Sequence, residues 1–183
     1  LLSIASPVNE FGTGIIYDHE DSGFYVVVDS EADLPGTGPT PSLSRDINIV
    51  TFDSQGESLE GGDSIVISTN KADYSTDIEL LAEDDRLMVG GYTEGEFENN
   101  TKKSESGTDG FISVYTTNQD FEFEDVTFQF GTKGNDKVIE IEKVNDYKLL
   151  VLWSEDDTSG DGTLTYRMSA FSAVGKMLSP QLD

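Results

Sequence analysis

The chain has 183 residues, and its 36 acidic residues against 11 basic ones give a formal net charge of −25 at pH 7. Phosphate backbones and anionic lipid surfaces repel such a chain, so nucleic-acid binding and electrostatic attachment to membranes are disfavoured. The chain has no cysteine, which excludes disulfides, thiolate metal sites and cysteine catalysis. No stretch approaches the roughly 20 apolar residues of a transmembrane helix.

Short apolar runs follow one another along the chain, and none continues as an apolar stripe at helical spacing. The runs are rich in Val, Ile, Phe, Tyr and Thr, and turn-forming Gly, Asn and Asp separate them. We expect strands near residues 14–17, 24–31, 46–52, 64–68, 78–81, 86–94, 109–115, 126–130, 138–141, 148–155 and 164–171, with 176–179 as a weaker candidate. The sequence therefore predicts an all-β fold of short antiparallel strands.

Similar runs of residues recur along the chain at a long, nearly constant interval. Val27, Val89 and Val151 are evenly spaced in similar strand-like runs, and the run that begins at Asp46 is echoed one interval later at Asp109. A long period of this kind indicates one supersecondary unit used several times. We expect residues 1–183 to form a single repeat domain with units near 9–70, 71–132 and 133–183, each a four-stranded sheet. Glycines at positions 56 and 175 follow the third run of their units and predict tight turns with positive φ.

Four-stranded units of this size favour a β-propeller, whose blades pack face to face around a channel. The middle unit reads Val89-Gly-Gly-Tyr-Thr, then Gly107-Thr-Asp-Gly-Phe-Ile-Ser-Val-Tyr115, then Gly131-Thr-Lys-Gly-Asn-Asp136. This text resembles the bacterial β-propeller repeat labelled SBBP, with its V-x-G-x-T strand, its D-[AG]-F strand start and its G-G-x-G-x-D step. The other two units keep only the hydrophobic frame, with Asp29 and Trp153 where the middle unit has Gly91. The resemblance implies a bacterial secreted or cell-surface, and hence extracellular, propeller. An outer-membrane lipoprotein, with its lipid anchor on a residue outside this chain, stays open as an alternative. The resemblance implies no catalytic residues.

Three units raise the question of how the ring closes, because propellers typically have four to eight blades. We expect this chain to be part of a larger propeller. Two alternatives stay open: two copies complete a six-bladed ring, or the units form an open array.

The sequence predicts no enzyme, since its one histidine, His19, lies in a turn-like segment and no serine has a nucleophile-elbow pattern. Calcium is the better chemical prediction. Asp157, Ser159 and Asp161 place oxygen ligands at the first, third and fifth positions of a loop, and a glycine follows, as in calcium-binding loops. The twelfth position is Met168 rather than Glu, so the pattern is equally typical of an exposed turn.

Two aromatic residues are candidates for ligand binding. Trp153 and Tyr92 lie near the ends of equivalent strands, where exposed rings could stack on carbohydrate. The alternative is that both rings pack between blades.

Two functions follow from these features. The first is a noncatalytic surface scaffold that binds a protein partner, or further blades, in a bacterial envelope assembly. The long loops at 32–44, with three prolines, and at 94–108 would then provide the contact surface. The alternative is a carbohydrate- or calcium-dependent ligand-binding propeller.

Overall fold

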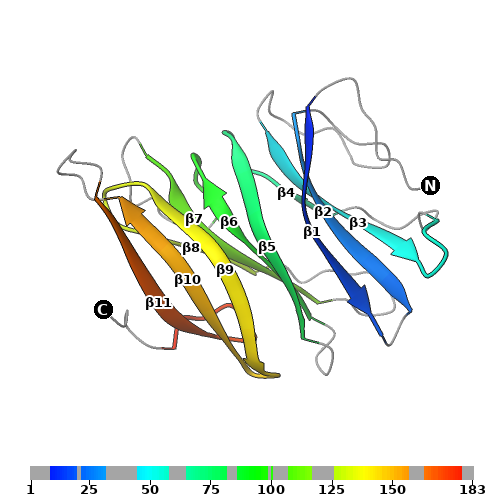
Figure 1. Cartoon of the computed structure of the whole chain (residues 1–183). Coiled ribbons are helices and arrows are strands. Elements are labelled where there is room, and N and C mark those ends of the chain that lie inside the picture. The colour runs from blue at the N-terminus through cyan, green and yellow to red at the C-terminus, as the bar shows by residue number, and fades with distance from the viewer. Residues whose placement is uncertain are drawn as a thin grey trace.

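The computed structural model describes residues 9–19, 22–31, 45–57, 65–81, 86–98, 100, 107–116, 126–156 and 163–178. These residues form strands arranged in three antiparallel sheets that stand side by side, and no helix occurs among them (Figure 1). The prediction of an all-β fold is confirmed. Each sheet lies within one of the three predicted units.

The sheets follow chain order, and within each sheet every strand pairs with the next one in sequence. The first sheet contains β1 (Glu10–Asp18), β2 (Gly23–Ser30), β3 (Asp46–Asp53) and β4 (Ile65–Ile67). The second contains β5 (Asp73–Leu81), β6 (Arg86–Thr93), β7 (Asp109–Thr116) and β8 (Val126–Phe130). The third contains β9 (Asp136–Asn145), β10 (Lys148–Asp156) and β11 (Leu164–Ser172).

Within the described residues, which end at 178, the third sheet shows the start of the fourth strand that the sequence suggested for residues 176–179. Met177 forms a single antiparallel bridge with Phe171, and the Leu178 amide donates to the Ala170 carbonyl at 2.7 Å. The turn that leads there matches the one after β3. Gly56 and Gly175 have φ of 77° and 72°, as predicted, and each amide donates to the carbonyl three residues earlier. The third unit therefore begins the same hairpin as the first.

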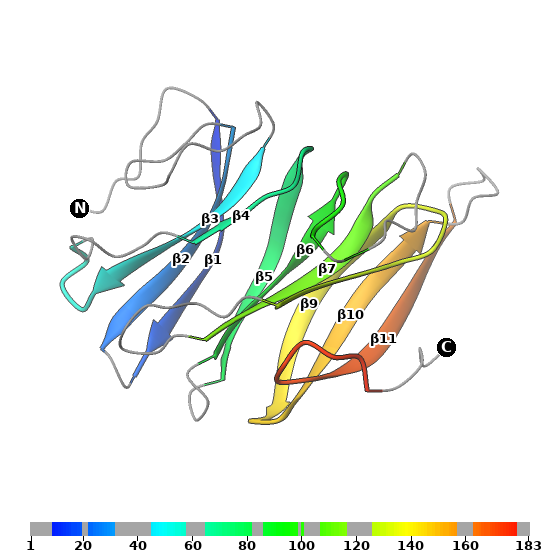
Figure 2. The ribbon, with the colours of Figure 1, turned by 180° about the vertical axis from the view of Figure 1, so that it is seen from behind.

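The sheets stack face to face through their first strands, so that β5 contacts β1 on one side and β9 on the other (Figure 2). Two separate apolar cores fill the spaces between them. Val27, Ile49, Ile78 and Val89 belong to the core between the first and second sheets. Met88, Ile112, Ile141 and Trp153 belong to the core between the second and third sheets. The stack is open at both ends, and the described strands form no closed ring.

The pairing corrects the repeat register by one residue in the first unit. Ile15, Ile78 and Ile141 pair with Val26, Val89 and Val151. Val26, and not Val27, is thus the counterpart of Val89. Because successive side chains of a strand point to opposite faces, this slip places Val27 on the other face of its sheet, where it packs with Val89 across the first core.

The first strand of each sheet has a β-bulge at the same position of the repeat unit. The extra, unpaired residue is Thr13 in β1, Thr76 in β5 and Ile139 in β9, and these positions are evenly spaced along the chain. The hydroxyls of Thr13 and Thr76 donate to the carbonyls of Val27 and Gly90 at 3.4 and 3.2 Å. Bulges of this type bend a strand and are fixed features of a fold. The bulge position therefore defines which residues of the three units are equivalent.

Candidate functional site

Trp153 lies inside the second core and has no exposed surface. Its ring packs edge-on against Phe130, with the ring centroids 5.4 Å apart, and its Nε1 donates to the Ser169 hydroxyl at 3.3 Å. Of the two roles that the sequence left open for Trp153, the structure gives it packing between sheets. Neither face of the indole is open to a carbohydrate.

Tyr92 lies at the rim of the stack, where two other side chains pack on its ring. Tyr74 stacks on one face at 4.7 Å between centroids and 12° between planes, and the Lys137 ammonium lies 4.4 Å from the ring centroid. Burial raises the pKa of the Tyr92 hydroxyl, and the neighbouring Tyr74 adds to the shift. The Tyr92 ring therefore packs against its neighbours, and carbohydrate binding at Tyr92 stays a prediction.

Tyr92 is one member of a row that links all three sheets. The Arg45 guanidinium lies 4.9 Å from the ring of Tyr74 and 4.0 Å from that of Phe11. We call the row Phe11, Arg45, Tyr74, Tyr92 and Lys137 the aromatic–cation ladder. Phe11, Tyr74 and Lys137 occupy the same position of the three successive repeat units, a signal that was present in the sequence and was missed. Cation–π contacts of this kind hold neighbouring sheets together at their rim.

The buried carboxylate of Asp29 contacts Arg45 of the aromatic–cation ladder. Asp29 accepts hydrogen bonds from the amide of Ser75, at 3.1 Å, and from the hydroxyl of the same residue, which also contacts the Thr13 hydroxyl. The Arg45 Nε lies 3.6 Å from the other Asp29 oxygen. Burial raises the pKa of Asp29, whereas Ser75 and Arg45 oppose the shift. The pairing corrects the sequence alignment here: Val28 is the counterpart of Gly91, and Asp29, the counterpart of Tyr92, connects the first two sheets.

Two further buried carboxylates begin the second and third sheets. Asp73 accepts from the Thr69 amide at 2.6 Å, and Asp136 accepts from the Thr132 amide at 2.7 Å, one repeat unit later. Burial raises the pKa of Asp73 to about 7, against the hydrogen bonds from Thr93 and Thr69. Burial likewise raises the pKa of Asp136 to about 6. The Thr–Asp pair thus fixes each passage from one sheet to the next.

The predicted calcium loop, with Asp157, Ser159 and Asp161, lies outside the described residues and stays a prediction. The adjacent Asp156 ends β10, where its carboxylate accepts from the Asn135 side-chain amide at 3.1 Å. Among the residues that the structure describes, no group of three or more His, Cys, Asp or Glu side chains could hold a metal ion. The 32–44 loop lies outside the described ranges, and the 94–108 loop is described only at residues 94–98, 100 and 107–108.

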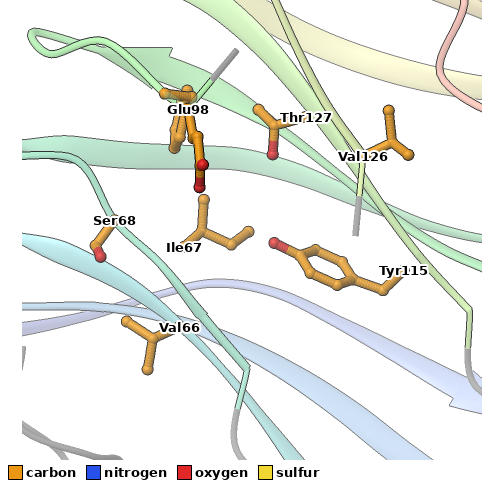
Figure 3. Close-up of a pocket in the computed structure, with 8 residues that line it drawn as sticks. Val66, Ile67, Ser68, Glu98, Tyr115, Val126 and Thr127 are labelled. Atoms are coloured by element: carbon orange, nitrogen blue, oxygen red, sulfur yellow. The ribbon is translucent and has the colours of Figure 1, made fainter. Parts of the chain in front are cut away.

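A pocket of about 400 Å³ opens between the last strands of the first and second sheets (Figure 3). Val66 and Ile67 of β4 line one side, and Tyr115 and Thr127 of the second sheet line the other. The 94–98 segment beside it is held by the Gln129 side chain, which accepts from the Phe97 amide and donates to the Gly95 carbonyl, each at 3.1 Å. Glu98 also lines the pocket, so an acidic side chain accompanies its apolar ones.

The two ends of the stack expose apolar faces. The face of the first sheet that points away from the second, here called the head face, includes Gly12, Ile15, Tyr17, Phe24 and Val26. The face of the third sheet that points away from the second, here called the tail face, includes Leu150, Leu152, Leu164, Tyr166 and Met168. The exposed fractions reach 65% for Ile15 and 60% for Tyr166. Exposed apolar patches of this kind mark interaction surfaces.

No protein-family model matches the chain, and no curated protein is significantly similar to it in sequence. The SBBP-type resemblance of the middle unit therefore stays a prediction. Within the described residues, the structure contains no helix with the length and apolar character that a membrane crossing requires.

Proposed function

We propose that this chain is a noncatalytic scaffold built from β-propeller-type blades, which binds protein partners at the bacterial cell surface or outside the cell. The observation that carries the proposal is the pair of apolar end faces. At the head face, Ile15 stands at the position where Ile78 and Ile141 are buried inside the stack. At the tail face, Met168 stands at the position of the buried Ile112.

The internal cores explain why such faces favour protein contacts. Repeat units cannot bury their apolar faces alone and stack on neighbours to do so. The end faces have the same pattern of side chains and lack that neighbour within the described chain. The surface setting rests on the SBBP-type resemblance, and the net charge of −25 supports a protein partner over nucleic acid.

Retention of the chain in a larger assembly tests this function. The full chain with Ile15→Glu or Met168→Glu should be lost from a high-mass envelope fraction of the source cells, because each change places a charge in an apolar contact. Tyr147→Glu is the matched control, since Tyr147 is 70% exposed in the β9–β10 turn and belongs to neither face. Equal retention of all three variants would contradict the proposal.

The alternative, a carbohydrate- or calcium-dependent ligand-binding propeller, is tested separately. Binding to a glycan array that disappears with a chelator and with Asp161→Ala would support it. Calorimetry with calcium alone should then show heat for the unmodified chain and none for Asp161→Ala. An unchanged heat signal would rule out the loop as the binding site.

A further inference from the structure

The two internal interfaces share one arrangement around the bulge. A residue on the second strand of one sheet faces two residues on the first strand of the next sheet. In the first interface Val27 and Ile78 share one core. The Thr13 hydroxyl, which donates to the Val27 carbonyl, contacts the Ser75 hydroxyl and so brings Ser75 next to Val27.

In the second interface, Gly90 takes the place of Val27 and faces Val138 and Ile141. A Cβ at position 90 would lie 2.7 Å from the Ile141 Cδ1 and 2.8 Å from the Val138 Cγ1. The pairing shows the equivalence directly, since Gly14 pairs with Val27 and Asp77 with Gly90, each next to its bulge. A small residue on one side is thus matched by a larger one on the other.

The same series continues on the two end faces. Leu152, which pairs with Glu140 next to the third bulge, is the tail-face counterpart of Gly90. Gly12 and Ile15 are the head-face counterparts of Val138 and Ile141. A Cβ on Gly12 would meet no atom within 4 Å, so this position has room for a larger partner. The three pairs are Val27 with Ser75, Gly90 with Val138, and Leu152 with Gly12. The combined size of the two side chains is therefore similar in each pair.

One polar contact belongs to the second interface, because Gly14 stands in the first sheet where the second sheet has Asp77. The Asp77 carboxylate of the second sheet accepts a hydrogen bond from the Ile141 amide of the third at 2.7 Å. One repeat unit after Asp77 stands Glu140, exposed beside the tail face, and the head-face counterpart of Ile141 is Ile15. The two end faces therefore match each other in size and in this acceptor position.

We propose that the tail face of one copy of this chain docks on the head face of a second copy, with Leu152 over Gly12 and Ile15 and with Glu140 accepting the Ile15 amide. Such an interface is head-to-tail, and a head-to-tail interface forms a ring when the rotation closes. Two copies would provide six sheets, within the four to eight of known propellers. The inference deepens the proposed function, on which it rests, by naming the partner as a second copy.

Sedimentation velocity of the purified 183-residue chain over a concentration series tests the proposal. The unmodified chain should sediment as a dimer, and Ile15→Glu or Leu152→Glu should weaken the dimer on the order of 100-fold, because each buries an unpaired charge. Tyr147→Glu should leave the dimer intact. The far-UV circular dichroism and the emission of the buried Trp153 establish that each variant is folded; Met168→Glu replaces Leu152→Glu if that variant is not.

A size exchange tests the specific contact. Gly12→Val should weaken the dimer at least about tenfold by overpacking against Leu152. The double variant Gly12→Val with Leu152→Ala recreates the order of the second internal interface, and its dimer should recover to within about threefold of the original. Dimers that show no such recovery would overturn the proposed register.

A monomer at all concentrations would overturn the self-docking proposal. If the end-face variants were still lost from the envelope fraction, the scaffold function would stand with a different partner, such as a sheet from another protein. If the chain were a dimer but the variants stayed in that fraction, self-docking would stand and the scaffold function would fail. The two proposals are thus separable.

Discussion

Ile15 and Ile78 occupy the same position of their repeat units, yet Ile15 is 65% exposed and Ile78 only 7%. Both follow a bulge in the first strand, and both pair with a valine of the second strand. The difference arises because Ile78 has the first sheet in front of it, whereas the described chain places no sheet in front of Ile15. The local sequence determines that both residues lie in a strand, and the presence of a neighbouring sheet determines how much of each side chain is buried.

The emission of Trp153, the only tryptophan, should report on the second core. We expect a blue-shifted maximum, weak quenching by acrylamide and no change on addition of sugars, because the ring is fully buried. Trp153→Ala should lower the free energy of unfolding by about 3–5 kcal/mol in urea titrations. Emission that shifts on binding a carbohydrate would contradict this placement.

Gly90 and Gly12 should respond to alanine in opposite ways. Gly90→Ala should lower the free energy of unfolding by about 1–3 kcal/mol, since the new methyl group overlaps Val138 and Ile141. Gly12→Ala is the matched control. It meets open space, and in the monomeric chain it should be neutral or stabilising by up to about 1 kcal/mol. Urea unfolding of both variants measures the difference, and equal effects would show that β9 does not approach Gly90 closely.

The ion pair between Asp29 and Arg45 should couple the first two sheets. Arg45→Met leaves the carboxylate buried without its cation, so we expect a loss of about 2–4 kcal/mol in the free energy of unfolding. Asp29→Asn should lose less, and the double variant should be more stable than the sum of the two single losses predicts. Additive losses in this double-mutant cycle would mean that the pair contributes no coupling.

The buried carboxylates make stability fall as pH rises. Burial raises the pKa of Asp73 to about 7 and that of Asp136 to about 6, from a value of 3.8 for a free side chain. Between about pH 4 and pH 7 the folded chain therefore binds more protons than the unfolded chain, and the free energy of unfolding decreases with pH. We expect a loss of more than about 2 kcal/mol from pH 4.5 to pH 7.5.

Asp73→Asn separates this effect from general charge repulsion. The variant should lose a large part of the pH dependence, measured by urea unfolding at both pH values. Asp53→Asn is the control, because the Asp53 carboxylate accepts from the Gln55 and Glu57 amides in the exposed turn after β3. If Asp73→Asn and Asp53→Asn kept the same slope, burial of Asp73 would not be its cause.

The sequence predicted the strands and the period because alternation and turn residues are local signals. It could not predict the bulges at Thr13, Thr76 and Ile139, since a bulge appears only in the pairing of two strands. The apolar–polar alternation of the second strand is the same with or without the extra residue in the first. The one-residue slip from Val26 to Val27 follows from this, because three consecutive valines give no signal for which one faces the next sheet. The role of Trp153 depends on the sheet packed over it, which no local pattern encodes.

The aromatic–cation ladder shows the opposite case. Phe11 and Tyr74 are both aromatic and stand at the same position of consecutive repeat units, so the repeat alone could have placed them together. Lys137 stands at the same repeat position but is not aromatic, so the repeat did not suggest it. Arg45 joins the row from the residue before β3, which only the packing of the sheets brings close to Phe11 and Tyr74.

Disulfide trapping between chains tests the central claim most directly, and the chain has no native cysteine to interfere. One preparation carries Ile15→Cys on the head face, and the other carries Leu152→Cys on the tail face. Mild oxidation of the mixture should give the mixed disulfide in high yield, well above the yield of Ile15→Cys with Tyr147→Cys. Equal yields for the two mixtures would contradict the account, because they would show that the end faces do not meet head to tail.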